Sequence, residues 1–176
     1  MIAPREALTA LENDLAPGER VLYTTRPDIG TTIRNKAFLW WIGVPLCIAI
    51  FGLFLAGRAS WAVLIPFGLV GLIMLAAPIV LAFETRSTLY AITDRRALIL
   101  RTGFRPSKTS CPFDRMDATP EVMTANGKSG HLTFASDMST KMRDVDYTGK
   151  LAFRDLADVH AAAAQLKAAR SRNSES

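Results

Sequence analysis

Hydrophobic positions along the chain fall into two long blocks, with polar positions before, between and after them. Residues 37–57 are 21 consecutive residues without a charge, and residues 59–83 are 25 more, with Arg58 between the blocks. A helix rises about 1.5 Å per residue, so each block is long enough to cross a hydrocarbon layer of about 30 Å. Amphipathic helices of soluble domains are rarely apolar on every face for so long. The pattern predicts a transmembrane hairpin with spans at 37–57 and 60–83.

Tryptophans and basic residues at the ends of the blocks predict how this hairpin is oriented. Trp40, Trp41 and Trp61 lie near block ends, where amphipathic rings anchor to the membrane interface. Basic residues flank the hairpin on its outer sides: Arg26, Arg34 and Lys36 before it, and Arg86, Arg95, Arg96 and Arg101 after it. The positive-inside rule therefore predicts that both termini lie in the cytoplasm. A polar stretch of 36 residues ahead of the first block argues against a cleavable signal peptide.

The polar parts of the chain carry shorter periodic patterns. Residues 4–15 have Leu8, Leu11 and Leu15 at helical spacing, and a short strand pattern follows a Pro-Gly turn. We expect this helix and strand, within residues 1–36, to pack on the domain that follows the hairpin. After residue 83 the period changes to two. Strands are predicted at 87–93, 97–102, 108–116, 120–125, 130–136 and 147–153, with a hairpin turn at Asn126-Gly127.

The last predicted element is an amphipathic helix. Asp155 is expected to cap it, and Leu156, Val159, Ala163 and Leu166 recur on one face. Residues 169–176 lack apolar anchors and are predicted to form a disordered tail. Several short strands closed by one C-terminal helix indicate an α+β fold for residues 84–168.

Several of these stretches resemble bacterial membrane proteins that carry a pleckstrin-homology-like domain. The similar parts are "LAPGERVLYTTRPD", the two hydrophobic spans, "LYAITDRRALIL" and "LAFRDLADVHAAAAQL", and the most specific is "YAITDRRALI" at residues 90–99. The resemblance implies a bent, barrel-like antiparallel sheet closed by the C-terminal helix, at the bacterial inner membrane. It implies no general enzymatic activity, and a related type with more spans suggests a role in protein docking.

The polar group Thr93-Asp94-Arg95-Arg96 at the centre of that stretch has two interpretations. In the first, Thr93 and Asp94 form the corner of a hairpin, with Asp94 bonding its own backbone or pairing with the arginines. In the second, the arginines contact lipid. Residues 86–108 carry six basic side chains and Asp94, a net charge of +5, the same as the whole chain. Basic residues next to a span are attracted to anionic headgroups by about 1 kcal/mol each. The candidate lipid-facing residues are Arg86, Arg95, Arg96, Arg101, Arg105 and Lys108.

Other chemistry has little support in the sequence. Asp144 and Asp146 lie on one face of a predicted strand but lack a partner histidine or nucleophile, so we interpret them as solvent-facing charges. Cys47 and Cys111 are not expected to form a disulfide, and the two histidines are too far apart in sequence to suggest a metal site. Aromatic residues are too sparse among the basic ones to indicate nucleic-acid binding. We expect no cofactor and no catalytic residue.

The sequence therefore predicts a non-catalytic, membrane-anchored docking or assembly module that binds another protein at the cytoplasmic face of the membrane. An exposed strand edge, or the neighbourhood of the closing helix, is the expected docking surface. The alternative is sensing of an anionic lipid surface through residues 86–108, and an enzyme acting on lipid comes third.

Overall fold

The structure is a computed structural model that describes residues 5–58, 60–103, 106–124, 127–142 and 144–174. It has an α+β architecture with two apolar helices and two antiparallel sheets. The chain divides into two compact units, which we call the hairpin unit, Thr32–Phe83, and the sheet unit, Met1–Thr31 with Glu84–Ser176.

Two long helices form the hairpin unit: α3 (Phe38–Leu55) and α4 (Trp61–Arg86), whose last three residues belong to the sheet unit. They approach closely where glycine leaves room for side chains of the neighbouring helix, because a Cβ on Gly43 would lie 2.9 Å from Cβ of Met74. Only 6% and 17% of their most apolar windows are buried, whereas a core helix of a soluble protein would bury most of its surface. Length and composition thus suit both helices to crossing a membrane, as predicted.

A short helix that the sequence did not predict precedes α3. The sequence pattern assigned no element to residues 29–36, which form α2 (Ile29–Lys36). Asp28 starts this helix, since its Oδ2 accepts hydrogen bonds from the backbone N–H of Thr31 at 2.7 Å and from the Thr31 hydroxyl at 2.9 Å. Residues 29–36 therefore form a helix that Asp28 caps.

Within its described residues, the sheet unit contains seven strands in two antiparallel sheets. The first has the order β1 (Val21–Thr25), β2 (Thr88–Thr93), β3 (Arg96–Arg101) and β4 (Ser107–Pro112). The second has the order β5 (Glu121–Thr124), β6 (Gly130–Ala135) and β7 (Leu151–Leu156). Strands β1 and β2 pair although the whole hairpin unit lies between them in sequence, with Thr25 opposite Tyr90. The hairpin is thus an insertion between two neighbouring strands.

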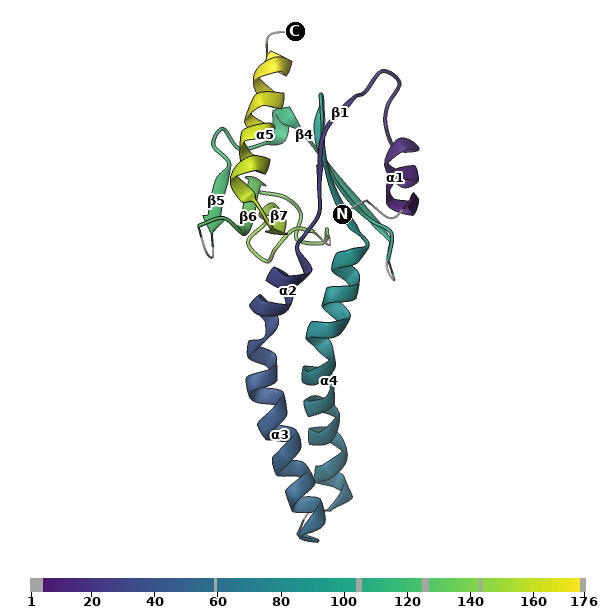
Figure 1. Ribbon diagram of the computed structural model, residues 1–176, viewed down its shortest axis with the longest axis vertical. Coiled ribbons are helices and arrows are strands. Elements are labelled where there is room, and N and C mark those ends of the chain that lie inside the picture. The colour runs from purple at the N-terminus through teal and green to yellow at the C-terminus, as the bar shows by residue number, and fades with distance from the viewer. Residues whose placement is uncertain (1–4, 59, 104–105, 125–126, 143, 175–176) are drawn as a thin grey trace. The chain divides into compact units, whose positions relative to one another are not determined.

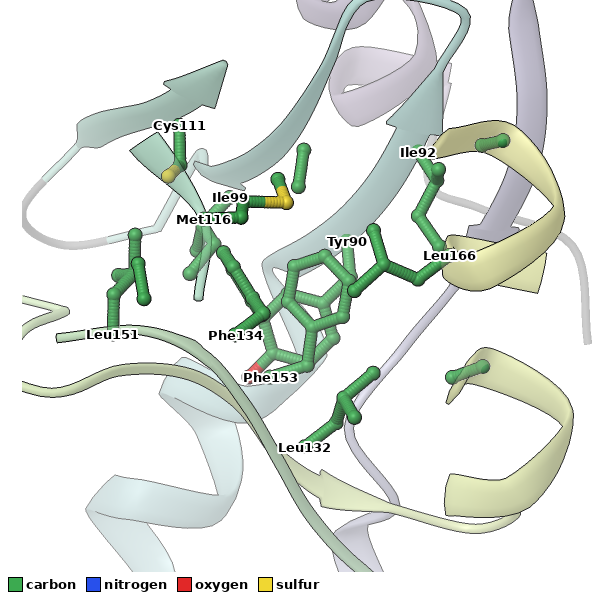
Figure 2. Packing of buried hydrophobic residues seen from close by; sticks show 14 of the residues in the cluster. Tyr90, Ile92, Ile99, Cys111, Met116, Leu132, Phe134, Leu151, Phe153 and Leu166 are labelled. Atoms are coloured by element: carbon green, nitrogen blue, oxygen red, sulfur yellow. The ribbon is translucent and has the colours of Figure 1, made fainter. Parts of the chain in front are cut away.

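The first sheet is covered on both faces, as Figure 1 shows. Helix α1 (Arg5–Glu12) packs Ala7 and Leu11 against Leu89 and Leu98 on one face. The main core lies on the other face, between the two sheets and α5 (Val159–Ser174). In that core the ring of Phe153 stacks on Tyr90 and meets Phe134 edge-on, each at a centroid distance of 4.7 Å (Figure 2). These contacts join both sheets in one apolar core.

In the described residues the strands form two separate antiparallel sheets, and neither sheet closes on itself. An isolated bridge between Pro27 and Leu156 connects the end of β1 to β7. The hydroxyl of Tyr90 adds a second link, because it bonds the backbone of Arg154 at 3.2 Å. Burial raises the pKa of that hydroxyl to about 12, so it remains protonated at neutral pH.

The C-terminal helix differs from its prediction at both ends. Asp155 does not cap it: Asp155 belongs to β7 with φ of 53°, and the cap is Asp158, whose Oδ1 accepts from the N–H of Ala161 at 3.0 Å. The predicted disordered tail, residues 169–176, is helical as far as Ser174, because Ala169 is buried against the core and extends the apolar face. Asn126 lies outside the described residues, while Gly127 has the expected positive φ, 71°.

Candidate functional site

The polar group at residues 93–96 forms the corner between β2 and β3, and Thr93 holds it. The fully buried Oγ1 of Thr93 accepts hydrogen bonds from the backbone N–H of Arg95 at 3.2 Å and of Arg96 at 3.0 Å. Asp94 does not bond its own turn. Its Oδ1 accepts from the N–H of Arg20 at 3.1 Å, and its N–H donates to the Arg20 carbonyl at 3.0 Å. Thr93 therefore stabilises the turn, whereas Asp94 joins the turn by hydrogen bonds to the segment before β1.

Arg96 binds a carboxylate that sequence reasoning did not connect with it. Its Nε donates to Glu19 Oε1 at 2.8 Å and its Nη2 to Glu19 Oε2 at 2.7 Å, in the two-pronged geometry that suits a guanidinium. The Arg96 Nη2 also donates to the Asp14 carbonyl at 2.9 Å. The hydrogen bonds from Arg96 hold the pKa of Glu19 at about 2. Only 21% of the Arg96 side chain is exposed, so most of it is withdrawn from any surface partner.

Arg101 is bound to a second buried carboxylate. Nε and Nη2 of Arg101 each lie 2.7 Å from Oδ1 of Asp144, and the hydroxyl of Thr109 donates to Oδ2 at 2.7 Å. Asp144 is 3% exposed, so its interpretation as a solvent-facing charge is wrong. Asp146 is half-buried and orders a turn by accepting from the N–H of Thr148 at 2.8 Å. The two carboxylates serve separate structural roles and do not form a pair.

The remaining basic residues of the segment differ in their surroundings. Lys108 is half-exposed and forms an ion pair with Asp14 of the connection between α1 and β1. Arg95 is exposed and has no ion pair among the described residues. Arg86 is exposed in the last turn of α4. Arg105 lies outside the described residues.

The basic residues of segment 86–108 lie at opposite ends of the β2–β3 hairpin: Arg86 and Arg101 at one end, Arg95 at the other. Thr88, which begins β2 two residues after Arg86, pairs with Arg101, whereas Arg95 lies beyond the far end of β2. The five steps between the six residues of β2, at about 3.3 Å each, separate its two ends by about 17 Å. The net charge of +5 on residues 86–108 falls to +2 once Glu19, Asp144 and Asp14 are counted with their partners. Three of the six basic residues of the segment are thus paired with acids, and its charges are divided between the two ends of the hairpin.

The free edge of β5 is the most exposed stretch of sheet. All four of its residues are exposed, including the apolar side chains of Val122, 37%, and Met123, 55%. Strand β5 pairs with β6 on one side and with no strand on the other in the described part of the chain. The backbone of β5 lies very close to Gly130, where a Cβ would come within 2.9 Å of the Met123 carbonyl carbon. Strand β5 therefore packs closely against β6 on one side, and its outer edge is exposed.

The tryptophans that the sequence assigned to the membrane interface lie at helix ends. Trp40 and Trp41 are in the first turn of α3, and Trp61 is the first residue of α4. Trp41 and Trp61 are highly exposed, whereas the indole N–H of Trp40 donates to the Leu75 carbonyl at 3.1 Å. Trp40 therefore also contributes to the contact between the two helices.

The described residues contain no group of three or more His, Cys, Asp or Glu side chains placed to hold a metal ion. Cys111 is buried in the main core, and burial raises the pKa of its thiol to about 11, which keeps it in the unreactive protonated form. The two histidines bind backbone groups: Asp155 donates its N–H to Nδ1 of His131 at 2.9 Å, and Nε2 of His160 lies 3.1 Å from the Gly127 carbonyl. These contacts are structural.

Comparison of the chain with models of protein families, with curated proteins and with solved structures finds no match.

Proposed function

We propose that this protein is a non-catalytic docking module, anchored by two membrane spans in a bacterial inner membrane, which binds another protein through the outer edge of β5. The observation that carries the proposal is the exposure of this edge. An unpaired strand offers a row of backbone N–H and C=O groups to an extended segment of a partner. Val122 and Met123 would add apolar contacts on the two faces of the extended sheet.

The order of elements supports a pleckstrin-homology-like domain as the docking part. Four antiparallel strands, three further antiparallel strands and a C-terminal helix follow one another in the sheet unit. The insertion of the hairpin supports the two-pass arrangement. Strands β1 and β2 pair with each other, so both ends of the hairpin return to one sheet and hence to one side of a membrane. The basic residues that flank the hairpin support the cytoplasmic side.

Site-specific photocrosslinking tests the docking edge. The full chain would carry a photoreactive phenylalanine analogue at Val122 or Met123 and be irradiated in native membranes. We expect a discrete adduct with one partner at either position. Tyr147 is the matched control, because it is 94% exposed but lies in the loop between β6 and β7. Adducts that are the same from Tyr147 as from β5 would refute docking at this edge.

A strand-breaking substitution is a second test of docking at the outer edge of β5. The Met123 carbonyl faces Gly130 of β6, so the next backbone N–H along the strand, that of Thr124, faces the outer edge. Thr124→Pro removes this N–H from the edge, whereas Thr124→Val keeps it. We expect the adduct at Val122 to disappear with Thr124→Pro and to persist with Thr124→Val. Persistence in both variants would show that the partner does not add a strand.

A further inference from the structure

A bulge interrupts the β6–β7 ladder at His131. The register of the ladder shifts between Gly130 and Leu132. The single residue His131 of β6 lies there opposite two residues of β7, Arg154 and Asp155. Asp155 has a φ of 53°, in the left-handed region that is uncommon for residues other than glycine. Because a bulge interrupts the ladder, the backbone groups of Asp155 need partners from outside it.

A side chain and a neighbouring segment supply those partners. The N–H of Asp155 donates to Nδ1 of His131 at 2.9 Å, and its carbonyl accepts from the N–H of Asp28 at 2.6 Å. Since an amide N–H can only donate, Nδ1 carries no proton, and the neutral ring has its proton on Nε2. The bridge between Pro27 and Leu156 lies one residue away on both segments. His131 therefore supports the residue through which β7 binds the segment before α2.

The carboxylate of Asp155 offers the His131 ring a second binding position. Its Oδ1 lies 3.9 Å from Nδ1, which is too long for a hydrogen bond but close enough for an ion pair with a protonated ring. The His131 side chain is 37% exposed, so protons from solvent reach the ring directly. Histidine side chains ordinarily change charge between pH 5 and 8. The ring thus has one partner on Asp155 for its neutral form and another for its charged form.

Asp155 is the acid at ion-pair distance from His131 in the described part of the chain. On β5, the residue opposite His131 is the apolar Met123. The second histidine, His160, has the reverse role: its Nε2 lies 3.1 Å from the carbonyl of Gly127, which can only accept, so this contact persists when the ring is protonated. The other charged or titratable side chains on or beside the surrounding elements are Arg26, Asp28, Tyr90 and Arg154, with the ion pairs Glu121–Lys150 and Lys128–Asp158. Protonation therefore changes the contact of His131 and not that of His160.

We propose that His131 is a pH-sensitive switch that sets how firmly β7 binds the segment before α2. A proton taken from solvent binds Nδ1, the ring becomes a cation, and Nδ1 changes from acceptor to donor. The N–H of Asp155 then loses its acceptor, and the ring turns to pair with the Asp155 carboxylate. Without that hydrogen bond the left-handed backbone of Asp155 relaxes, and its carbonyl binds Asp28 less firmly. The switch goes beyond protein docking and depends on neither a partner at β5 nor a membrane.

Hydrogen exchange of the full chain in detergent, measured by mass spectrometry at pH 7.5 and pH 5.5, tests the switch. After correction for intrinsic rates, we expect the peptide that covers β7 to exchange about tenfold faster at pH 5.5, the effect of losing one hydrogen bond. His131→Asn supplies an amide oxygen near the position of Nδ1 and does not titrate, so we expect slow exchange at both pH values. His160→Gln is the matched control and should respond like the wild type. A wild-type response in His131→Asn, or an equal loss of response in both variants, would overturn the proposal.

Nuclear magnetic resonance of the wild type locates the proton without any variant. The chain has two histidines, so both rings are resolved when histidine alone carries an isotopic nitrogen label. At pH 7.5 we expect the neutral His131 ring to carry its proton on Nε2, and a proton on Nδ1 would overturn the switch. Asp155→Asn keeps a residue that tolerates the left-handed backbone but removes the carboxylate. We expect this variant to move the exchange transition to lower pH, whereas an unmoved transition would overturn the second position of the ring and with it the switch.

Discussion

The ion pair between Glu19 and Arg96 is expected to hold the segment before β1 on the hairpin corner. Glu19→Gln keeps the shape of the side chain but removes the charge. The wild-type carboxylate is 1% exposed and accepts two guanidinium bonds and the Ala16 N–H at 2.8 Å. Its pKa falls from 4.5 to about 2. At 1.36 kcal/mol per unit, ionisation of Glu19 contributes about 3 kcal/mol to the free energy of unfolding at neutral pH.

The sign of the pH dependence follows from the lowered pKa. A carboxyl group with a lower pKa in the folded state stabilises the fold fully above its unfolded value, 4.5, and the stabilisation is lost as the pH falls toward 2. We therefore expect the wild type to lose about 3 kcal/mol between pH 4.5 and pH 2 through this group. Glu19→Gln should lack this component because it has no proton to gain there.

Hydrogen exchange measured by mass spectrometry is the suitable assay. All three tryptophans lie in the hairpin unit, so their fluorescence does not report on the sheets. For peptides that cover β2 and β3, we expect Glu19→Gln to raise exchange rates about 100-fold at pH 7, after correction for intrinsic rates. Glu12→Gln, an exposed acid on α1, is the matched control. Unchanged exchange in Glu19→Gln, or an equal change in both variants, would refute the role of this ion pair.

Two further substitutions probe the sheet unit. Gly130→Ala should lower the free energy of unfolding by about 2 kcal/mol, measured by thermal unfolding, because the new Cβ would press on the Met123 carbonyl carbon at 2.9 Å. Asp144→Asn should speed hydrogen exchange of the loop between β6 and β7, since it breaks the buried pair with Arg101 and destabilises the fold by about 3 kcal/mol.

Each of these substitutions has a control that carries the same chemical change. Gly52→Ala adds a methyl group where nothing lies within 4 Å and should leave the unfolding temperature unchanged. Asp146→Asn removes a half-buried charge and should affect only its own turn. If Gly130→Ala were as stable as the wild type, the close packing of β5 against Gly130 would be contradicted. Loop exchange as slow in Asp144→Asn as in Asp146→Asn would contradict the role of the buried pair.

Local patterns identified most of the elements because their signals lie within a few residues. The two apolar blocks predicted α3 and α4, and alternation of period two predicted the strands on either side of the corner at Thr93. The boundaries of helices are harder to predict where two nearby residues could each form the cap. Asp155 and Asp158 both suit a helix cap, and only the path of β7 determines that Asp158 takes that position.

The partners of the charged residues were decided by the tertiary structure alone. Arg96 and Glu19 are 77 positions apart, Lys108 and Asp14 are 94 apart, and neither spacing corresponds to a helix or strand repeat. The pairing of β1 with β2 brings the first pair together across the hairpin, and the packing of α1 on the first sheet brings the second. Hydrophobicity and backbone preference act locally, so the order of residues is enough to predict where the chain is apolar and how it alternates. Which carboxylate neutralises which cation depends on long-range packing, and this packing pairs three of the six basic residues of the segment, Arg96, Arg101 and Lys108, within the fold.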